Sequence, residues 1–172
     1  MKAAETIQTP DGTIRAHEGE IVATLTTGED GKATTPKLYL GTYMVYEAKA
    51  KDGYALDVIE KTVALEYAGQ DVAVYDYEEA VTDEPTNPSI KKVDALDPEV
   101  PVAGAVFHIW NDEGTFDEEM TTDEDGIISL AYAKHGSYHT QEVSAPEGYA
   151  IVDLDEEGNP TVTDFKVNDQ GM

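Results

Sequence analysis

TTDEDGIISLAYAKHGSYHTQE, at residues 121–142, is a second version of TTGEDGKATTPKLYLGTYMVYE, at residues 26–47. Both stretches open with two threonines and an acidic turn, and both end in Gly-x-Tyr-x-x-x-Glu, with corresponding positions 95 residues apart. A period of this length is too long for a solenoid repeat and suits tandem small domains. The sequence therefore predicts two copies of one module, with residues 1–86 as the first domain and residues 87–172 as the second.

Apolar residues in both copies alternate with polar residues instead of recurring at helical spacing. Gly, Asp and Pro clusters separate these runs, which is typical of short antiparallel strands joined by turns. We predict an all-β chain of two tandem Ig-like β-sandwich domains. The polar segment 83–88 carries two prolines and is predicted to be a short, stiff linker. The β-rich runs lie at 21–25, 37–40, 43–46, 62–67, 102–110, 127–131, 137–142 and 161–167.

The composition excludes several classes of function. A net charge of −25 and a pI near 4.1 argue against nucleic-acid binding and against binding to anionic membrane surfaces, because both need basic residues. The absence of cysteine excludes disulfides and a thiolate nucleophile. No apolar run reaches about 18 residues, so no membrane insertion is predicted. Neither a signal core nor a sorting signal is present, which leaves a cytosolic protein or an internal piece of a longer one.

Several stretches carry a resemblance to a known family. The chain resembles the Cna B-type domains, also called SpaA-like or prealbumin-like domains, which build stalks and pilins on Gram-positive bacteria. The resemblance implies an Ig-like β-sandwich and an extracellular, wall-linked protein. It also implies an intramolecular isopeptide bond between a first-strand lysine and a last-strand Asn or Asp, assisted by a glutamate. The stretches are TLTTGEDGKATTPKLYLGTYMVYEAKAKDGYALD at 24–57, KKVDALDPEVPVAGAVFHIW at 91–110, TTDEDGIISL at 121–130 and GSYHTQEVSAPEGY at 136–149.

Such a bond has a physical rationale in a buried setting. A lysine amine attacks a carbonyl carbon only when it is unprotonated, and burial in an apolar core favours that state. Burial also keeps a glutamate protonated, so that it can hydrogen-bond the target carbonyl and carry a proton to the leaving group. Fixed proximity and exclusion of water supply the rest.

In the second copy, Glu142 occupies the position that the resemblance makes the proton carrier. Strand alternation places Ile90 and Lys92 on one face and Lys91 on the other. With Ile90 inward, Lys92 is inward as well, so Lys92 is our first candidate for the reactive lysine and Lys91 the alternative.

Each copy is expected to lack one terminal strand of the family's domain, and with it one partner of the bond. In the first copy Glu47 corresponds to Glu142, and Asp83 resembles the acceptor of a last strand. Lys2 is the only lysine near the start of that copy and is not favoured. In the second copy Asn168 is a less favoured acceptor, since it resembles a turn before the absent strand.

Other signals are weaker. The acidic turns at 29–31 and 123–126 lack the full pattern of a calcium loop, and a hairpin turn explains them equally well. His135 and His139 are not expected to bind a metal, and Trp110 is expected to pack on a sheet instead of binding sugar. We predict no metal site and no cofactor.

We interpret the chain as a structural spacer of a surface adhesin or pilus protein, anchored to the cell wall through parts of the parent protein outside this chain. Its expected partners are neighbouring repeats, and open strand edges also favour strand-swapped self-association. The alternatives are a module that binds a host protein or glycan, and an accessory domain of a secreted enzyme. No turnover of an external substrate is expected, since the isopeptide chemistry happens once per molecule.

Overall fold

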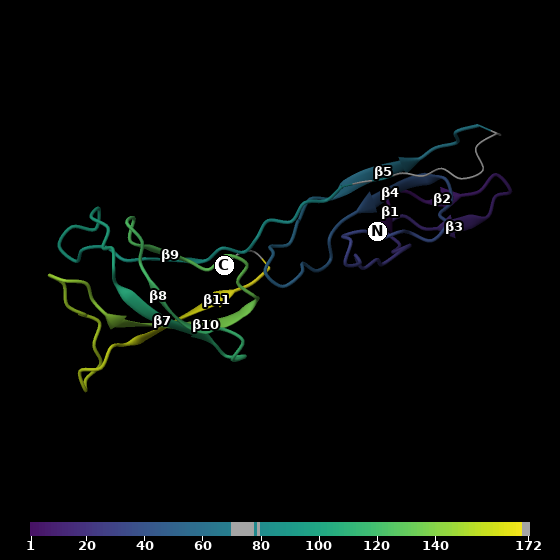
Figure 1. The fold of residues 1–172 in the computed structure, drawn as a ribbon. Coiled ribbons are helices and arrows are strands. Elements are labelled where there is room, and N and C mark those ends of the chain that lie inside the picture. The colour runs from purple at the N-terminus through teal and green to yellow at the C-terminus, as the bar shows by residue number, and fades with distance from the viewer. Residues whose placement is uncertain (70–77, 79, 170–172) are drawn as a thin grey trace. The chain divides into compact units, whose positions relative to one another are not determined.

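The computed structural model describes residues 1–69, 78 and 80–169, and these residues form strands, turns and loops without a helix. No part of this described chain therefore offers a helix that could cross a membrane. Contacts divide the chain into two compact units. The first comprises Met1–Ala48 and Asp57–Thr82, and the second comprises Lys49–Leu56 and Asp83–Met172 (Figure 1). The prediction of an all-β fold of tandem β-sandwich domains is confirmed.

The second unit contains two antiparallel sheets. The larger has the strand order β11-β10-β7-β8, so β10 lies between β7 and β11 (Figure 1). Its strands are β7 (Val106–Asn111), β8 (Asp117–Thr121), β10 (Gly136–Ser144) and β11 (Val162–Val167). The smaller sheet pairs β6 (Ser89–Lys91) with β9 (Ile127–Ser129).

The core of this unit follows from alternation along the strands. In β7, Phe107 and Ile109 are buried while His108 and Trp110 are partly exposed on the other face. Burial of each large apolar side chain stabilises the fold by about 1.5–3 kcal/mol. The buried cluster comprises Ala105, Phe107, Ile109, Ile128, Leu130, Ala133, Tyr138 and Val167.

Gly126 fixes the end of the smaller sheet. It has a φ of +72°, and a Cβ built on it would lie 2.4 Å from the carbonyl oxygen of Lys92. Only glycine fits this close approach and this conformation without strain. The Lys92 N–H donates to the Gly126 carbonyl at 2.8 Å, so the glycine turn holds the backbone at Lys92 in place.

The predicted linker at 83–88 packs as part of the second unit. The Ala55 N–H donates to the Glu84 carbonyl at 2.8 Å, and Thr86 is 1% exposed. The Thr86 hydroxyl also donates to the Ala133 carbonyl at 2.6 Å. Proline and polar composition alone did not reveal these partners, since they lie far away in sequence. The boundary between residues 86 and 87 stays a prediction.

The first unit has a smaller regular part. A sheet in the order β1-β4-β5 and a pair β2-β3 surround a buried cluster of Ala3, Ile7, Ala16 and Tyr43. The strands are β1 (Lys2–Ala3), β2 (Ile7–Gln8), β3 (Ile14–Ala16), β4 (Gly41–Val45) and β5 (Lys61–Leu65).

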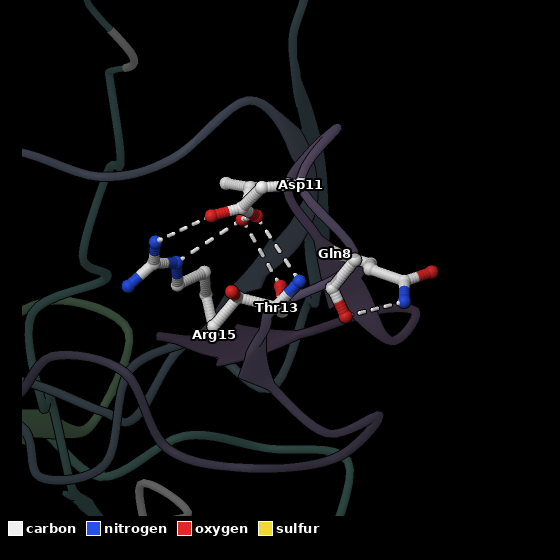
Figure 2. A network of polar contacts seen from close by, with 6 residues as sticks. Gln8, Asp11, Thr13 and Arg15 are labelled. Carbon is white, nitrogen blue, oxygen red and sulfur yellow. Dashed lines mark hydrogen bonds and ion pairs between the residues drawn. The ribbon is translucent and has the colours of Figure 1, made fainter.

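A polar network closes the turn between β2 and β3 (Figure 2). The Asp11 carboxylate accepts from the Thr9 hydroxyl at 2.6 Å and from the Thr13 N–H at 3.1 Å. Arg15 lies 3.8 Å from the same carboxylate, and the Gln8 side chain donates to the Gly12 carbonyl at 2.8 Å. The hydrogen bonds from Thr9 and Thr13, first that of the Thr9 hydroxyl, lower the pKa of Asp11.

Two strands expected in the first copy are not formed. Apart from a single bridge at Ile21, residues 21–25 have no strand pairing, and residues 37–40 have none. Leu25 is 41% exposed and Leu40 is 51% exposed. An alternating run becomes a strand only when a neighbouring edge supplies hydrogen bonds and a core covers its apolar face, and neither run has both here.

Candidate functional site

The structure brings together a lysine and a glutamate that are 50 residues apart in sequence. Lys92, directly after β6, donates from Nζ to Oε2 of Glu142 on β10 at 2.6 Å. The Glu142 side chain is 8% exposed and the Lys92 side chain 22% exposed. A charged pair this short and this well covered is unusual for residues that are mostly found in solvent.

The neighbouring lysine does not take part in this contact. Lys91 lies in β6 opposite Ile127 and is exposed, while Ile90 and Lys92 are partly buried. The faces are those expected from strand alternation, so it is Lys92 that reaches Glu142.

Two buried oxygen atoms at this site have no hydrogen-bond partner among the residues that the structure describes. They are Oε1 of Glu142 and Oγ1 of Thr140, two residues earlier on the same face of β10. Leaving a buried polar atom unpaired costs about 1–3 kcal/mol, so such atoms in native proteins commonly serve a ligand, a water or a reaction. The Lys92–Glu142 site therefore has unused hydrogen-bonding capacity.

A cavity of about 360 Å³ adjoins the pair. Its wall combines apolar side chains with the two polar groups, and β6 forms one side of it. Among the described strands, β6 is paired with β9 alone, which leaves its other edge without a strand partner. The lining includes Ile90, Lys92, Phe107, Thr140, Glu142 and Phe165.

This arrangement suits transfer of one proton between the two side chains. Moving a proton from Nζ of Lys92 to Oε2 of Glu142 leaves a neutral amine and a neutral acid. The amine is then a nucleophile, and the acid can donate to a carbonyl oxygen held in the cavity.

The equivalent glutamate of the first unit has a different partner. Oε2 of Glu47 accepts from the Asp57 backbone N–H at 2.7 Å. Lys2 instead donates to Glu60 at 2.8 Å and lies over the Tyr46 ring, 5.2 Å from its centroid. The structure thus gives Glu47 a loop-closing contact and shows no contact with Lys2.

Neither candidate acceptor is buried beside Lys92. Asp83 is exposed and belongs to the second unit, in the segment that pairs with residues 53–55. Asn168 is exposed directly after β11. Neither side chain is among those that line the cavity.

The acidic turn before Gly126 is explained by backbone hydrogen bonds. Oδ1 of Asp123 accepts from the N–H groups of Asp125 at 3.0 Å and Ile127 at 2.8 Å. Within the described part of the chain, no group of three or more His, Asp or Glu side chains could hold a metal ion.

One cluster was not expected from the sequence. His139 on β10 contacts two carboxylates, Asp164 from Nδ1 at 2.8 Å and Asp112 from Nε2 at 2.7 Å. These hydrogen bonds, first that of Asp112, raise the pKa of His139 and lower that of Asp112. Strand alternation could have placed His139 on the outer face, but the sequence does not contain the register that sets Asp164 opposite it.

Two β-sheet modules, the second with a partly buried acid–amine pair, define a tandem β-sandwich protein. The model of the SpaA prealbumin-like fold domain matches this chain twice, at residues 6–79 and 86–171. The chain belongs to this family, and the resemblance drawn from its motifs is confirmed.

Solved structures similar to this chain include a Bacillus anthracis protein and two bacterial pilins. The Bacillus anthracis TIE protein is 27% identical, with 86% of this chain and 26% of that chain covered and a TM-score of 0.44. The Streptococcal ancillary pilin is 20% identical, with coverages of 96% and 50% and a TM-score of 0.36. The shaft pilin SpaA from Lactobacillus rhamnosus GG is 18% identical, with coverages of 91% and 76% and a TM-score of 0.37.

This chain thus spans about a quarter of the TIE protein and half of the ancillary pilin. No match was found among curated proteins.

Proposed function

We propose that the chain is a structural spacer of a pilus or adhesin on a Gram-positive cell surface, and that its second module forms a Lys–Asn or Lys–Asp isopeptide bond through Lys92. Family membership supports the spacer role. The single observation that carries the crosslink is the 2.6 Å contact between Lys92 and the buried Glu142, beside an apolar cavity. Its expected partners are neighbouring repeats of the same polypeptide, outside the cell.

The proposed reaction conserves atoms and protons. Neutral Nζ of Lys92 attacks the carbonyl carbon of an Asn or Asp side chain in the cavity, while protonated Glu142 donates to the carbonyl oxygen. Glu142 then moves a proton from the amine to the leaving group, which departs as ammonia from Asn or as water from Asp. The product is an amide, and Glu142 is regenerated. The reaction takes place once per molecule.

The two unpaired oxygens indicate which acceptor side chain, Asn or Asp, fits the cavity. Oε1 of Glu142 and Oγ1 of Thr140 both have free capacity to accept a hydrogen bond, so the N–H donors of an Asn carboxamide complement them. An Asp carboxylate would add charge beside Glu142 in a chain of net charge −25. The free edge of β6 offers backbone hydrogen bonds to an extended segment that carries this Asn. Asp83 and Asn168 remain our sequence-based candidates within the chain.

Intact-mass spectrometry tests the proposal. Because Asp83 and Asn168 are exposed, we expect the chain alone to show no mass loss. The chain is then incubated with a synthetic peptide of residues 78–88 in which Asn replaces Asp83. We expect a covalent adduct whose mass is the sum of the two minus one ammonia.

Matched variants identify the residues. The adduct should disappear in Lys92→Ala and in Glu142→Gln, and persist in Lys91→Ala, whose side chain is exposed on the other face. No adduct with the wild-type chain, together with no internal mass loss, would reject the crosslink. An adduct that survives Lys92→Ala would show that another lysine reacts.

A host-protein or glycan-binding role is the alternative function. Carbohydrate recognition commonly uses exposed aromatic rings, and Trp110 is the single tryptophan of the chain. Its indole stacks with His108 at 4.6 Å and with His139 at 5.3 Å between ring centroids. These contacts occupy the ring with neighbouring side chains, which favours the spacer over the glycan-binding role.

A further inference from the structure

The outer face of the larger sheet carries a charged cluster that the proposed crosslink does not use. His139, in the middle of β10, has a carboxylate oxygen within 2.8 Å of each ring nitrogen. Asp164 belongs to β11, directly opposite His139 in register, and Asp112 directly follows β7. One imidazole thus joins the central strand β10 to both of its neighbours.

This geometry requires a particular protonation state. A carboxylate only accepts hydrogen bonds, and a neutral imidazole has one N–H donor and one acceptor nitrogen. Neutral His139 could therefore satisfy one of its two carboxylates, while the other nitrogen would face an acceptor. Only the imidazolium donates to both Asp112 and Asp164.

The charged groups around His139 favour the same state. Asp164 and Lys166 face it from β11, and Asp112 faces it from the end of β7. From β7 itself, Trp110 stacks against His139, and beyond Trp110 lies the pair of His108 with Asp117 on β8, 2.7 Å apart. Two carboxylates in direct contact outweigh one lysine that lies beside Asp112. The side chain of His139 is 21% exposed, so protons reach it from solvent.

The strand that this cluster holds is an edge strand. Among the described residues, β11 pairs with β10 only and ends the strand order of its sheet. Asp164 lies on its outer face, while Thr163 and Phe165, on the inner face, line the cavity beside Lys92 and Glu142. A change that weakens the pairing of β11 with β10 therefore also makes one wall of that cavity less rigid.

We propose that His139 is a pH-dependent clamp that holds edge strand β11 against the sheet when its ring is an imidazolium and loosens it when the ring loses a proton. The clamp is present at mildly acidic and near-neutral pH and weakens on the alkaline side. It does not depend on the isopeptide chemistry.

The direction follows from linkage. Because the pKa of His139 is raised in the folded state, its contribution is fully present below the unfolded value of 6.5. It is lost as the pH rises through the higher folded value. Strand β11 should then exchange its amide hydrogens faster, relative to their intrinsic rates.

NMR on the whole chain between about pH 5 and about pH 9 tests the clamp. Ring ¹⁵N shifts should show both His139 nitrogens protonated at pH 6.5, with a midpoint above that value. Amide protection in Val162–Val167, corrected for intrinsic exchange, should fall roughly two- to five-fold across the same midpoint, the scale of one exposed ion pair.

Variants separate the clamp from general effects of charge. His139→Gln should remove this pH dependence of β11. His108→Gln, which alters a histidine with one carboxylate partner, should keep it. The Asp164→Asn variant removes one carboxylate partner and keeps the histidine. It should lower the pKa of His139 and reduce the pH dependence of amide protection in β11. A His139 midpoint at or below 6.5, or equal pH dependence in wild type and His139→Gln, would overturn the proposal.

Discussion

The two units share the Gly-x-Tyr-x-x-x-Glu motif. Its tyrosine has the same structural role in both units, whereas its glutamate has different partners. The motif tyrosine has the same role in both, because Tyr43 and Tyr138 are each 2% exposed. The Tyr43 hydroxyl donates to the Tyr39 carbonyl at 2.7 Å, and the Tyr138 hydroxyl donates to the Lys134 carbonyl at 3.1 Å. The motif tyrosine is thus an anchor of the fold in each module.

The motif glutamate differs, and so does the turn glycine. Glu142 contacts Lys92, whereas Glu47 contacts the Asp57 backbone. A Cβ at Gly126 would collide with the Lys92 carbonyl, whereas a Cβ at Gly31 would meet nothing within 4 Å among the described residues. In the second unit the residue directly after β6 lies against the turn and supplies the lysine. The role of the motif glutamate therefore depends on β6 and the lysine after it, which lie outside the motif.

The largest expected difference between the units concerns the glycines. Gly126→Ala combines a positive φ with a collision against backbone, so we expect it to destabilise the second unit by at least about 3 kcal/mol. Urea unfolding followed by Trp110 fluorescence reports on that unit.

Gly31→Ala is the matched control for this prediction. It has only the strain of its φ of +72°, so a cost of about 1 kcal/mol is expected in the first unit by calorimetry. Equal losses in the two variants would contradict the asymmetry.

The second-largest expected difference is the loss of stability when the motif glutamate of each unit is replaced. Glu142→Ala leaves the amine of Lys92 partly buried without its partner. We expect a loss of about 2 kcal/mol, below the 3–5 kcal/mol of fully buried pairs, because Lys92 is 22% exposed. Glu47→Ala removes one hydrogen bond and should cost about 1 kcal/mol. Denaturant midpoints measure both, and a larger loss for Glu47→Ala would reverse our ranking of the two sites.

The tyrosines should behave alike. Tyr43→Phe and Tyr138→Phe each remove one hydroxyl donor to a backbone carbonyl and keep the packed ring. A loss of about 1 kcal/mol is expected in each unit. Thermal unfolding of the two variants checks this, and an effect confined to one unit would show that the shared anchor is not equivalent.

The smallest effect is a difference in pH response. Asp11 in the first unit and Asp112 in the second both have lowered pKa values, so both contributions to stability are present above 3.8 and are lost as the pH falls through the lowered values. Both units should therefore weaken in acid. Only the second unit should also weaken as the pH rises through the raised pKa of His139. Amide exchange resolved by residue distinguishes the two units, and a matching alkaline loss in the first unit would remove the contrast.

Local pattern predicted much of the second unit and less of the first. The runs at 102–110, 137–142 and 161–167 overlap strands β7, β10 and β11, because each run meets a partner edge and a core. The runs at 21–25 and 37–40 have similar alternation but lack such a setting. Alternation indicates which residues can share a face, and it does not supply the neighbour that makes the strand.

The candidate site divides in the same way. Alternation around Ile90 predicts Lys92 on the inner face, and the repeat singles out Glu142, so the sequence indicates both residues of this contact. The sequence does not predict the cavity, the unpaired oxygens or the two carboxylates beside His139. They arise where strands far apart in sequence are placed side by side.

The sequence by itself determined that this protein is all-β, that it repeats one module after 95 residues, and that each copy carries a glutamate at the same motif position. These properties follow from periodicity and spacing, which are local and survive without a partner. Only the tertiary structure decided that Glu142 meets an amine while Glu47 meets a backbone N–H, and that His139 lies between two carboxylates. Contacts between residues 10 to 50 positions apart depend on strand register and on which edge is paired, and the energy of those choices belongs to the assembled sheets.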